Sequence, residues 1–145
     1  MRDYPEFENP QQRPRYTGLP IFMGTPYRED MEGLDIAQVG IPFDGGVTNR
    51  TGARHGPREI RNQSSLMRMI NQATGINPYE LCSIADVGDA WVQKPFELTG
   101  ALQEIEEFYQ MVHQSGTVPV SAGGDHSVTL PIFRAIAKDR PLGMV

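Results

Sequence analysis

Short apolar runs alternate along this chain with longer stretches whose apolar residues recur at helical spacing. The apolar runs cover residues 34–41, 81–87 and 117–122, and a further run begins at residues 142–145. Each of the first three is closed by proline or glycine, which is typical of a strand that ends in a turn. Runs of this length are too short for helices, so they predict four β-strands, of which the last is only beginning.

Three helices are predicted between these strands. Pro57 favours a helix start, because a proline at the first helical position loses no hydrogen bond, and an apolar stripe then continues to Ile70. Residues 98–112 carry apolar side chains at every third or fourth position, and residues 130–136 repeat the pattern. This order of elements predicts an α/β domain that has a parallel sheet with helices on both faces.

One domain is expected for 145 residues, because a chain of this length supports one hydrophobic core. Residues 1–17 contain three prolines and show no periodicity, so we expect an irregular amino-terminal arm there, followed by the α/β domain at residues 18–145. Ligands of parallel sheets bind beyond the carboxyl ends of the strands. Two glycine-rich segments, residues 45–56 and 123–127, therefore fall where function is expected.

The charge and the cysteine content narrow the range of partners. The formal net charge is -5, with 18 acidic and 13 basic residues and no run of Lys or Arg. This balance argues against a nucleic-acid surface and against an anionic-membrane surface. The single Cys82 has no partner for an internal disulfide, and no apolar run approaches the roughly 20 residues of a membrane helix. A reducing cytoplasm is the expected location.

The segment after the third predicted strand places a carboxylate and an imidazole side by side, at Asp125 and His126. Gly123 and Gly124 allow the backbone to turn tightly there, and His126 then offers a ring nitrogen to a metal ion. The alternative is that Asp125 caps the following helix while His126 is an ordinary loop histidine. The local pattern alone leaves both interpretations open.

The glycine-rich loop, residues 45–56, carries four polar side chains that are able to meet a substrate: Asn49, Arg50, Arg54 and His55. Arg50 or Arg54 is suited to pair with a carboxylate on a small molecule. The alternative is that these side chains cap neighbouring carbonyls or contact another subunit. A phosphate-binding role is disfavoured, because the glycine spacing matches neither a Walker-type loop nor a dinucleotide fingerprint.

Three separated motifs, in this order along the chain, resemble those of the ureohydrolases, the arginase and agmatinase family. They are Gly40-Ile41-Pro42-Phe43-Asp44 with the later Arg50-Thr51-Gly52-Ala53-Arg54-His55-Gly56-Pro57, then Asp86-Val87-Gly88-Asp89, and finally Gly123-Gly124-Asp125-His126-Ser127. The first is similar to the agmatinase branch, and the last to the first signature of the family. Residues 48–59 and 62–68 look closer to guanidinopropionase-like and guanidinobutyrase-like members than to arginases. The resemblance extends over residues 17–145.

The resemblance implies an arginase-like three-layer α/β/α fold and a binuclear manganese centre, for which nickel is an alternative. It makes His126 a ligand of that centre and gives Asp125 a supporting or pocket role beside it. Metal-activated water would then attack the guanidino carbon and release urea. The other ligands of the family belong to Asp-rich stretches that are expected beyond Val145.

The resemblance also implies a hydrolase that acts on a linear guanidino compound. Guanidinopropionate or guanidinobutyrate is the expected substrate and agmatine the next, with guanidine or metformin as further alternatives. A homo-oligomer, trimeric or hexameric, is expected, and a hetero-oligomer is the other possibility. A non-catalytic subunit of the same fold, paired with an active ureohydrolase, is the alternative function.

The 145 residues contain only one of the implied metal ligands, with one aspartate beside it. Because a pair of divalent ions needs more ligands than these, we expect the 145 residues to be inactive alone and to belong to a protein of roughly twice this length. The predicted strand at residues 142–145 would be left as an unpaired apolar edge in an isolated molecule, and such edges promote aggregation.

Overall fold

The computed structural model describes Pro14 and residues 16–144. Most of the predicted amino-terminal arm, residues 1–17, lies outside the described residues, and so does Val145. The described part contains three strands and four α-helices around one apolar core. None of the described helices combines the length and the hydropathy that crossing a membrane requires.

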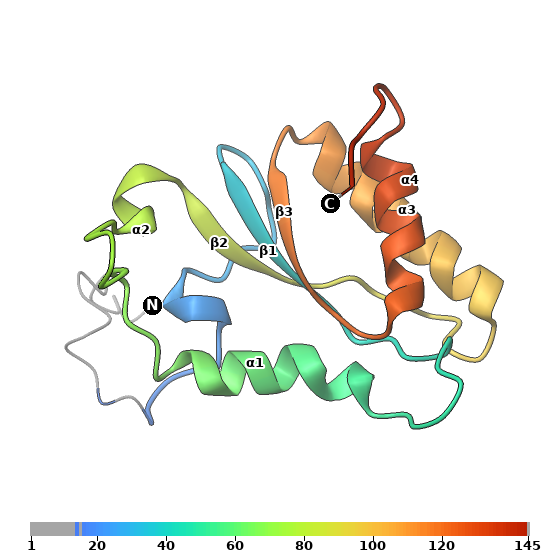
Figure 1. Ribbon diagram of the computed structural model, residues 1–145, viewed down its shortest axis with the longest axis horizontal. Coiled ribbons are helices and arrows are strands. Elements are labelled where there is room, and N and C mark those ends of the chain that lie inside the picture. Colours follow the sequence, from blue (N-terminus) through green and yellow to red (C-terminus); the bar gives the residue numbers. More distant parts are fainter. Residues whose placement is uncertain (1–13, 15, 145) are drawn as a thin grey trace, which may run out of the picture.

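Three parallel strands form the sheet, in the order β2-β1-β3. The central strand β1 spans Ile36–Ile41, β2 spans Ile84–Asp89 and β3 spans Val118–Gly123. Figure 1 shows β1 between its two neighbours. The predicted parallel α/β sheet is confirmed. Its parallel direction brings the carboxyl ends of all three strands to one edge.

Different helices cover the two faces of the sheet (Figure 1). On one face α3 (Leu98–Gln114) packs against α4 (Thr129–Ile136). On the other face α1 (Gly56–Ser64) packs against β1 and β3 and contacts the 3₁₀ turn η2 (Phe22–Gly24). Helices on both faces are therefore confirmed, as the sequence predicted.

Side chains of β1 alternate between these two faces, as the period of a strand requires. Val39 and Ile41 are fully buried in the core that β1 shares with Ile105 and Tyr109 of α3. The hydroxyl oxygen of Tyr109 lies 2.6 Å from that of Ser121 in β3. Burial raises the pKa of Tyr109 to about 12, with the hydrogen bond to Ser121 acting against it, so the phenol stays protonated at neutral pH.

The opposite face of β1 carries Ile36, the polar Gln38 and then Gly40. Gln38 accepts a hydrogen bond from the Thr25 hydroxyl at 2.8 Å. A Cβ atom on Gly40 would overlap the Asp89 carboxylate and would lie 3.0 Å from Cβ of Pro57 in α1. The absence of a side chain at Gly40 therefore lets the start of α1 and the end of β2 approach β1 closely.

Helix α1 is shorter than predicted, since it ends at Ser64 and not at Ile70. The Ser64 hydroxyl donates to the carbonyl of Ile60 at 2.6 Å, so the side chain competes for the acceptors of the last turn. Leu66 and Ile70, which extended the predicted stripe, are exposed. The apolar pattern after Ser64 therefore faces solvent in the described structure and does not mark a buried helix face.

The second and fourth predicted strands also differ from the structure. β2 begins at Ile84 and not at Leu81, because Leu81 ends the short helix α2 (Pro78–Leu81). The side chain of Asn77 caps that helix by accepting from the amide of Tyr79 at 3.1 Å. The predicted fourth strand is wrong for the described residues: residues 141–144 have no regular structure. No described strand pairs with them, and a strand needs a ladder partner.

Candidate functional site

The carboxyl ends of β1 and β3 form the edge at which the sequence places the candidate site. Ile41 and Gly123 are paired in the sheet, and the pairing continues beyond it. The amide of Gly124 donates to the Ile41 carbonyl at 3.1 Å, and the amide of Asp125 donates to the Phe43 carbonyl at 2.9 Å. A side chain at Gly124 would overlap both carbonyls, so only glycine permits this approach.

Asp125 connects the turn after β3 to the glycine-rich loop. One carboxylate oxygen accepts from the amide of Ser127 at 2.8 Å and also from its hydroxyl, which caps the 3₁₀ helix η4 (His126–Val128). The other oxygen accepts from the amide of Gly46 at 2.7 Å. The capping role considered from the sequence is therefore present, and the same carboxylate also holds the loop that leaves β1.

His126 is the first residue of η4, and its side chain is exposed at this edge. Asp125, whose carboxylate is engaged by Gly46 and Ser127, fixes the backbone on which His126 sits. Among the residues that the structure describes, no three His, Cys, Asp or Glu side chains are grouped so that they could hold a metal ion. His126 thus offers an accessible imidazole at the turn after β3, and a metal centre here would need further ligands from outside the described residues.

Asp44 was not among the predicted site residues, yet it organises the glycine-rich loop. Its side chain is fully buried. One carboxylate oxygen accepts from the amides of Gly52 and Arg54, at 2.6 and 3.3 Å, and the other accepts from Nε of Arg54 at 2.5 Å. We call this set of contacts, Asp44 with Gly52 and Arg54, the loop clasp. It joins the two ends of the loop through a single carboxylate.

The loop clasp also fixes the charge of its carboxylate. The Arg54 guanidinium and the Gly52 amide lower the pKa of Asp44 from its ordinary 3.8 to about 2, with burial opposing them. The Asp44 carboxylate in turn raises the pKa of Arg54. Both groups are therefore charged throughout the physiological range, and the pair is permanently ionic there.

The structure separates the four predicted substrate residues into two kinds. Arg54 is engaged by Asp44, whereas Asn49, Arg50 and His55 are exposed on the loop. His55 ends the 3₁₀ turn η3 (Ala53–His55), directly before α1. A Cβ on the next residue, Gly56, would lie 3.1 Å from the carbonyl oxygen of Gly123. The end of the loop therefore lies against the end of β3, three residues before His126.

A second ionic cluster, which the sequence analysis missed, anchors α1 to the sheet. Arg61 donates from Nε and Nη2 to the two oxygens of Asp86, at 2.8 and 2.9 Å, and from Nη1 to Asp89 at 2.6 Å. Its guanidinium also lies 4.0 Å from the ring centroid of Phe22. The buried Asp86 carboxylate also accepts from the amides of Gly88 at 2.9 Å and Phe22 at 3.0 Å, so it connects its own turn and η2 to Arg61.

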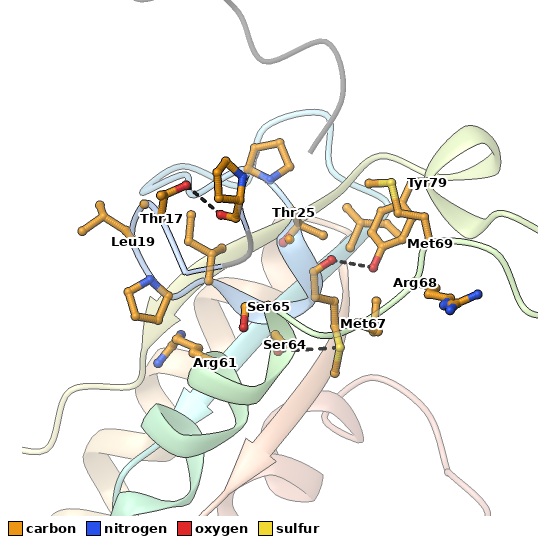
Figure 2. A pocket seen from close by; sticks show the side chains of 18 of the residues that line it. Thr17, Leu19, Thr25, Arg61, Ser64, Ser65, Met67, Arg68, Met69 and Tyr79 are labelled. Carbon is orange, nitrogen blue, oxygen red and sulfur yellow. Dashed lines mark hydrogen bonds between the residues drawn. The ribbon is translucent and has the colours of Figure 1, made fainter. Parts of the chain in front are cut away.

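A groove of about 960 Å³ lies away from this edge, between η2, the end of α1 and α2 (Figure 2). Its lining includes Met23, Met67 and Tyr79, and the Tyr79 hydroxyl donates to the Met23 carbonyl at 2.8 Å. Ile84, the first residue of β2, also lines it. The groove is therefore at the amino end of the sheet, whereas His126 and the glycine-rich loop are at the carboxyl end.

The model of the arginase family matches residues 34–145, which include both strand ends, the glycine-rich loop and His126. This chain belongs to the arginase family. Among the relatives of this arginase-family chain is guanidinopropionase from Pseudomonas aeruginosa, which is 52% identical over 99% of this chain and 45% of its own length. The chain thus spans less than half of that relative.

Solved structures agree with this assignment of the arginase-family chain. Proclavaminate amidino hydrolase from Streptomyces clavuligerus superimposes with a TM-score of 0.82 at 32% identity, over 88% of this chain and 42% of that one. Formiminoglutamase from Trypanosoma cruzi, solved with Mn²⁺₂, superimposes with a TM-score of 0.64 at 27% identity, over 79% and 38%. The arginase-like fold is therefore shown, and a member of that fold binds two manganese ions.

Proposed function

We propose that the protein carrying this chain is a hydrolase that cleaves the guanidino group of a linear guanidino acid to urea and an amine. The observation that carries the proposal is the joint at Asp125. This carboxylate holds Gly46 of the glycine-rich loop against the turn that presents His126. A candidate metal ligand and a candidate substrate loop are thus fixed as one unit at the carboxyl edge, where ligands of parallel sheets bind.

The proposed cofactor is a pair of Mn²⁺ ions, with Ni²⁺ as the alternative. His126 would supply one ligand, and the remaining ligands would come from outside the described residues. When bound, such ions supply an activated water at neutral pH. Asp125 holds the turn under His126 through Ser127 and holds the glycine-rich loop beside that turn through Gly46. Support for the metal comes from the exposed imidazole and from the manganese-containing relative.

The substrate we favour carries a carboxylate, as guanidinopropionate and guanidinobutyrate do. Arg50 is exposed on the glycine-rich loop, and its guanidinium makes no ion pair with another described residue. An arginine recognises a carboxylate through two parallel hydrogen bonds, so Arg50 suits the acidic end of such a substrate. Agmatine is the next candidate, followed by guanidine and metformin. The relative named guanidinopropionase supports ranking a guanidino acid first among these substrates.

A non-catalytic subunit of the same fold is the second candidate function. Among the described residues His126 is the one candidate metal ligand, so the choice between the two functions rests on the full-length protein. Urea release by the purified full-length protein separates the two.

We further propose a trimeric or hexameric homo-oligomer and a reducing cytoplasm, where Cys82 remains a free thiol.

The deciding experiment replaces His126 with alanine in the full-length protein. We expect manganese content to fall from two ions towards one per chain, and urea release from guanidinopropionate to fall by more than about 100-fold, because outer partners of ligands alone are worth 10–100-fold. Metal content is read by elemental analysis and urea by a colorimetric assay. His113→Ala is the matched control, because His113 pairs with Asp139 at the end of α3.

The His113→Ala control should keep both ions and full activity. Normal metal content and normal urea release in His126→Ala would remove His126 from the metal centre. A wild-type protein that binds two ions but releases no urea from any of the guanidino compounds would favour the non-catalytic alternative.

A further inference from the structure

The glycine-rich loop is held at three places and is otherwise exposed. At its start the amide of Gly46 donates to Asp125. Near its end the amide of Gly52 donates to Asp44 at 2.6 Å, and Gly56 packs against the carbonyl of Gly123. Residues 48–52 between these points are exposed. The loop therefore keeps a defined position through its ends and presents its middle to solvent.

Arg54 contributes to the second of these anchor points with both its backbone and its side chain. Its amide and its Nε donate to different oxygens of Asp44, and Nη2 approaches the same carboxylate. The Asp44 side chain is fully buried, whereas that of Arg54 is 44% exposed. Withdrawing the guanidinium would leave a buried carboxylate without its cation, which costs more than the pair gains. Arg54 is therefore committed to Asp44.

We infer that Arg54 is a positioning residue that closes the glycine-rich loop through Asp44, and that it does not bind the carboxylate of the substrate. This inference refines the proposed function, because it removes one of the two arginines from substrate recognition and leaves Arg50 for that role. The loop clasp itself does not depend on the reaction, so it is testable even if the protein releases no urea.

The first test is limited proteolysis of the full-length protein with trypsin. Cleavage of the bond between Arg50 and Thr51 reports how often the loop opens. In Arg54→Met and in Asp44→Asn we expect this cleavage to become about tenfold faster, as loss of a contact pair worth about 1.4 kcal/mol would produce. Fragment masses identify the cleaved bond, and circular dichroism confirms that the fold is retained.

Three further variants sharpen this test. Arg58→Met removes an exposed arginine at the start of α1 and should leave cleavage after Arg50 unchanged. The double variant Asp44→Asn with Arg54→Met should be no more sensitive than either single variant, because both remove the same contact. Arg54→Lys should restore part of the protection against cleavage that Arg54→Met loses. Lysine keeps the positive charge but lacks the planar guanidinium that makes two parallel hydrogen bonds. Native cleavage rates in Arg54→Met would overturn the inference.

The second test compares two substrates, guanidinopropionate and agmatine, which differ in whether the far end carries a carboxylate. A positioning role predicts that Arg54→Met lowers kcat/KM by the same factor for both. Arg50→Met, by contrast, should raise KM for guanidinopropionate by about tenfold and should not raise KM for agmatine, which has no carboxylate to lose. A loss in Arg54→Met that is confined to guanidinopropionate would overturn the inference. Absence of urea release from both substrates would contradict the proposed function alone.

Discussion

Asp44 shows how one buried carboxylate is made compatible with an apolar surrounding. A buried charge is costly unless it is paired and hydrogen-bonded. Asp44 receives two amide donors and the guanidinium of Arg54, so both of its oxygens are satisfied. No buried side-chain nitrogen or oxygen lacks a partner among the residues that the structure describes. The charge of Asp44 therefore stabilises the loop, and this contribution to the free energy of unfolding should depend on pH.

This pH dependence is a testable prediction for Asp44→Asn. The folded state lowers the pKa of Asp44 from 3.8 to about 2, so the stabilisation from its charge is complete above 3.8 and is lost as the pH falls towards 2. The urea midpoint of the variant should lie below that of the wild type by a constant amount above about pH 5. The difference should shrink as the pH falls below 3.8. A difference that grows on acidification would contradict this assignment.

At the scale of elements, the interface between α1 and the sheet is ionic as well as apolar. Arg61 bridges α1 to Asp86 and Asp89 at the end of β2, and its face covers the Phe22 ring of η2. The side chain of Arg61 is only 12% exposed and that of Asp86 only 2%. The Arg61 guanidinium therefore connects α1, β2 and η2. The glycine-rich loop ends at the start of α1, the helix that Arg61 anchors.

Replacing Arg61 with methionine should accordingly destabilise the protein by roughly 3–5 kcal/mol, because breaking a buried pair leaves an uncompensated charge on Asp86. Equilibrium unfolding in urea measures the change. Arg58→Met, on the exposed side of the same helix, should change the free energy of unfolding by no more than about 0.5 kcal/mol. A loss below about 1 kcal/mol for Arg61→Met would show that Asp86 is satisfied without its cation.

The sequence predicted three strands and the long helix well, because short apolar runs closed by turn residues and apolar residues at helical spacing are visible in the chain itself. The predicted fourth strand at residues 142–145 was wrong for the described residues, where no partner strand is present. It also placed His126 and the glycine-rich loop at one edge, which the structure confirms. It failed at α1 after Ser64, where apolar side chains are exposed. The pairs of Asp44 with Arg54 and of Arg61 with Asp86 were missed, because ion pairs between a loop or helix and a strand end follow no period.

At the scale of the whole molecule, the two outer strands of the sheet differ within the described residues. The outer side of β2 is partly covered, because the amide and the carbonyl of Asp86 are hydrogen-bonded to Pro26 and Arg28. On the outer side of β3 no described strand pairs with it. On β3 the side chains of Val118 and Val120 are 60% and 53% exposed. Exposed apolar residues on an outer strand favour pairing of that strand with another chain.

Residues 1–145 produced by themselves should therefore associate as their concentration rises. Val120→Lys should reduce the association, because a charge on an outer strand opposes edge-to-edge pairing. Light scattering over a concentration series measures the effect. Ile76→Lys makes the same change at an exposed apolar residue outside the sheet and should have little influence. Monodisperse, monomeric wild-type chain at high concentration would contradict this expectation.

The anchoring of the glycine-rich loop at Gly46 and Gly52 has a consequence for how specificity can diverge. Only residues 47–51 lie between these two amides, and neither anchor uses their side chains. This short segment can change by substitution without disturbing the joint to His126 or the clasp at Asp44. Under the proposed function, a new substrate preference can thus arise while the residues that hold His126 stay unchanged. Guanidinopropionase and proclavaminate amidino hydrolase are relatives named for different compounds. The segment that corresponds to residues 47–51 can be exchanged as a unit between such relatives and this chain.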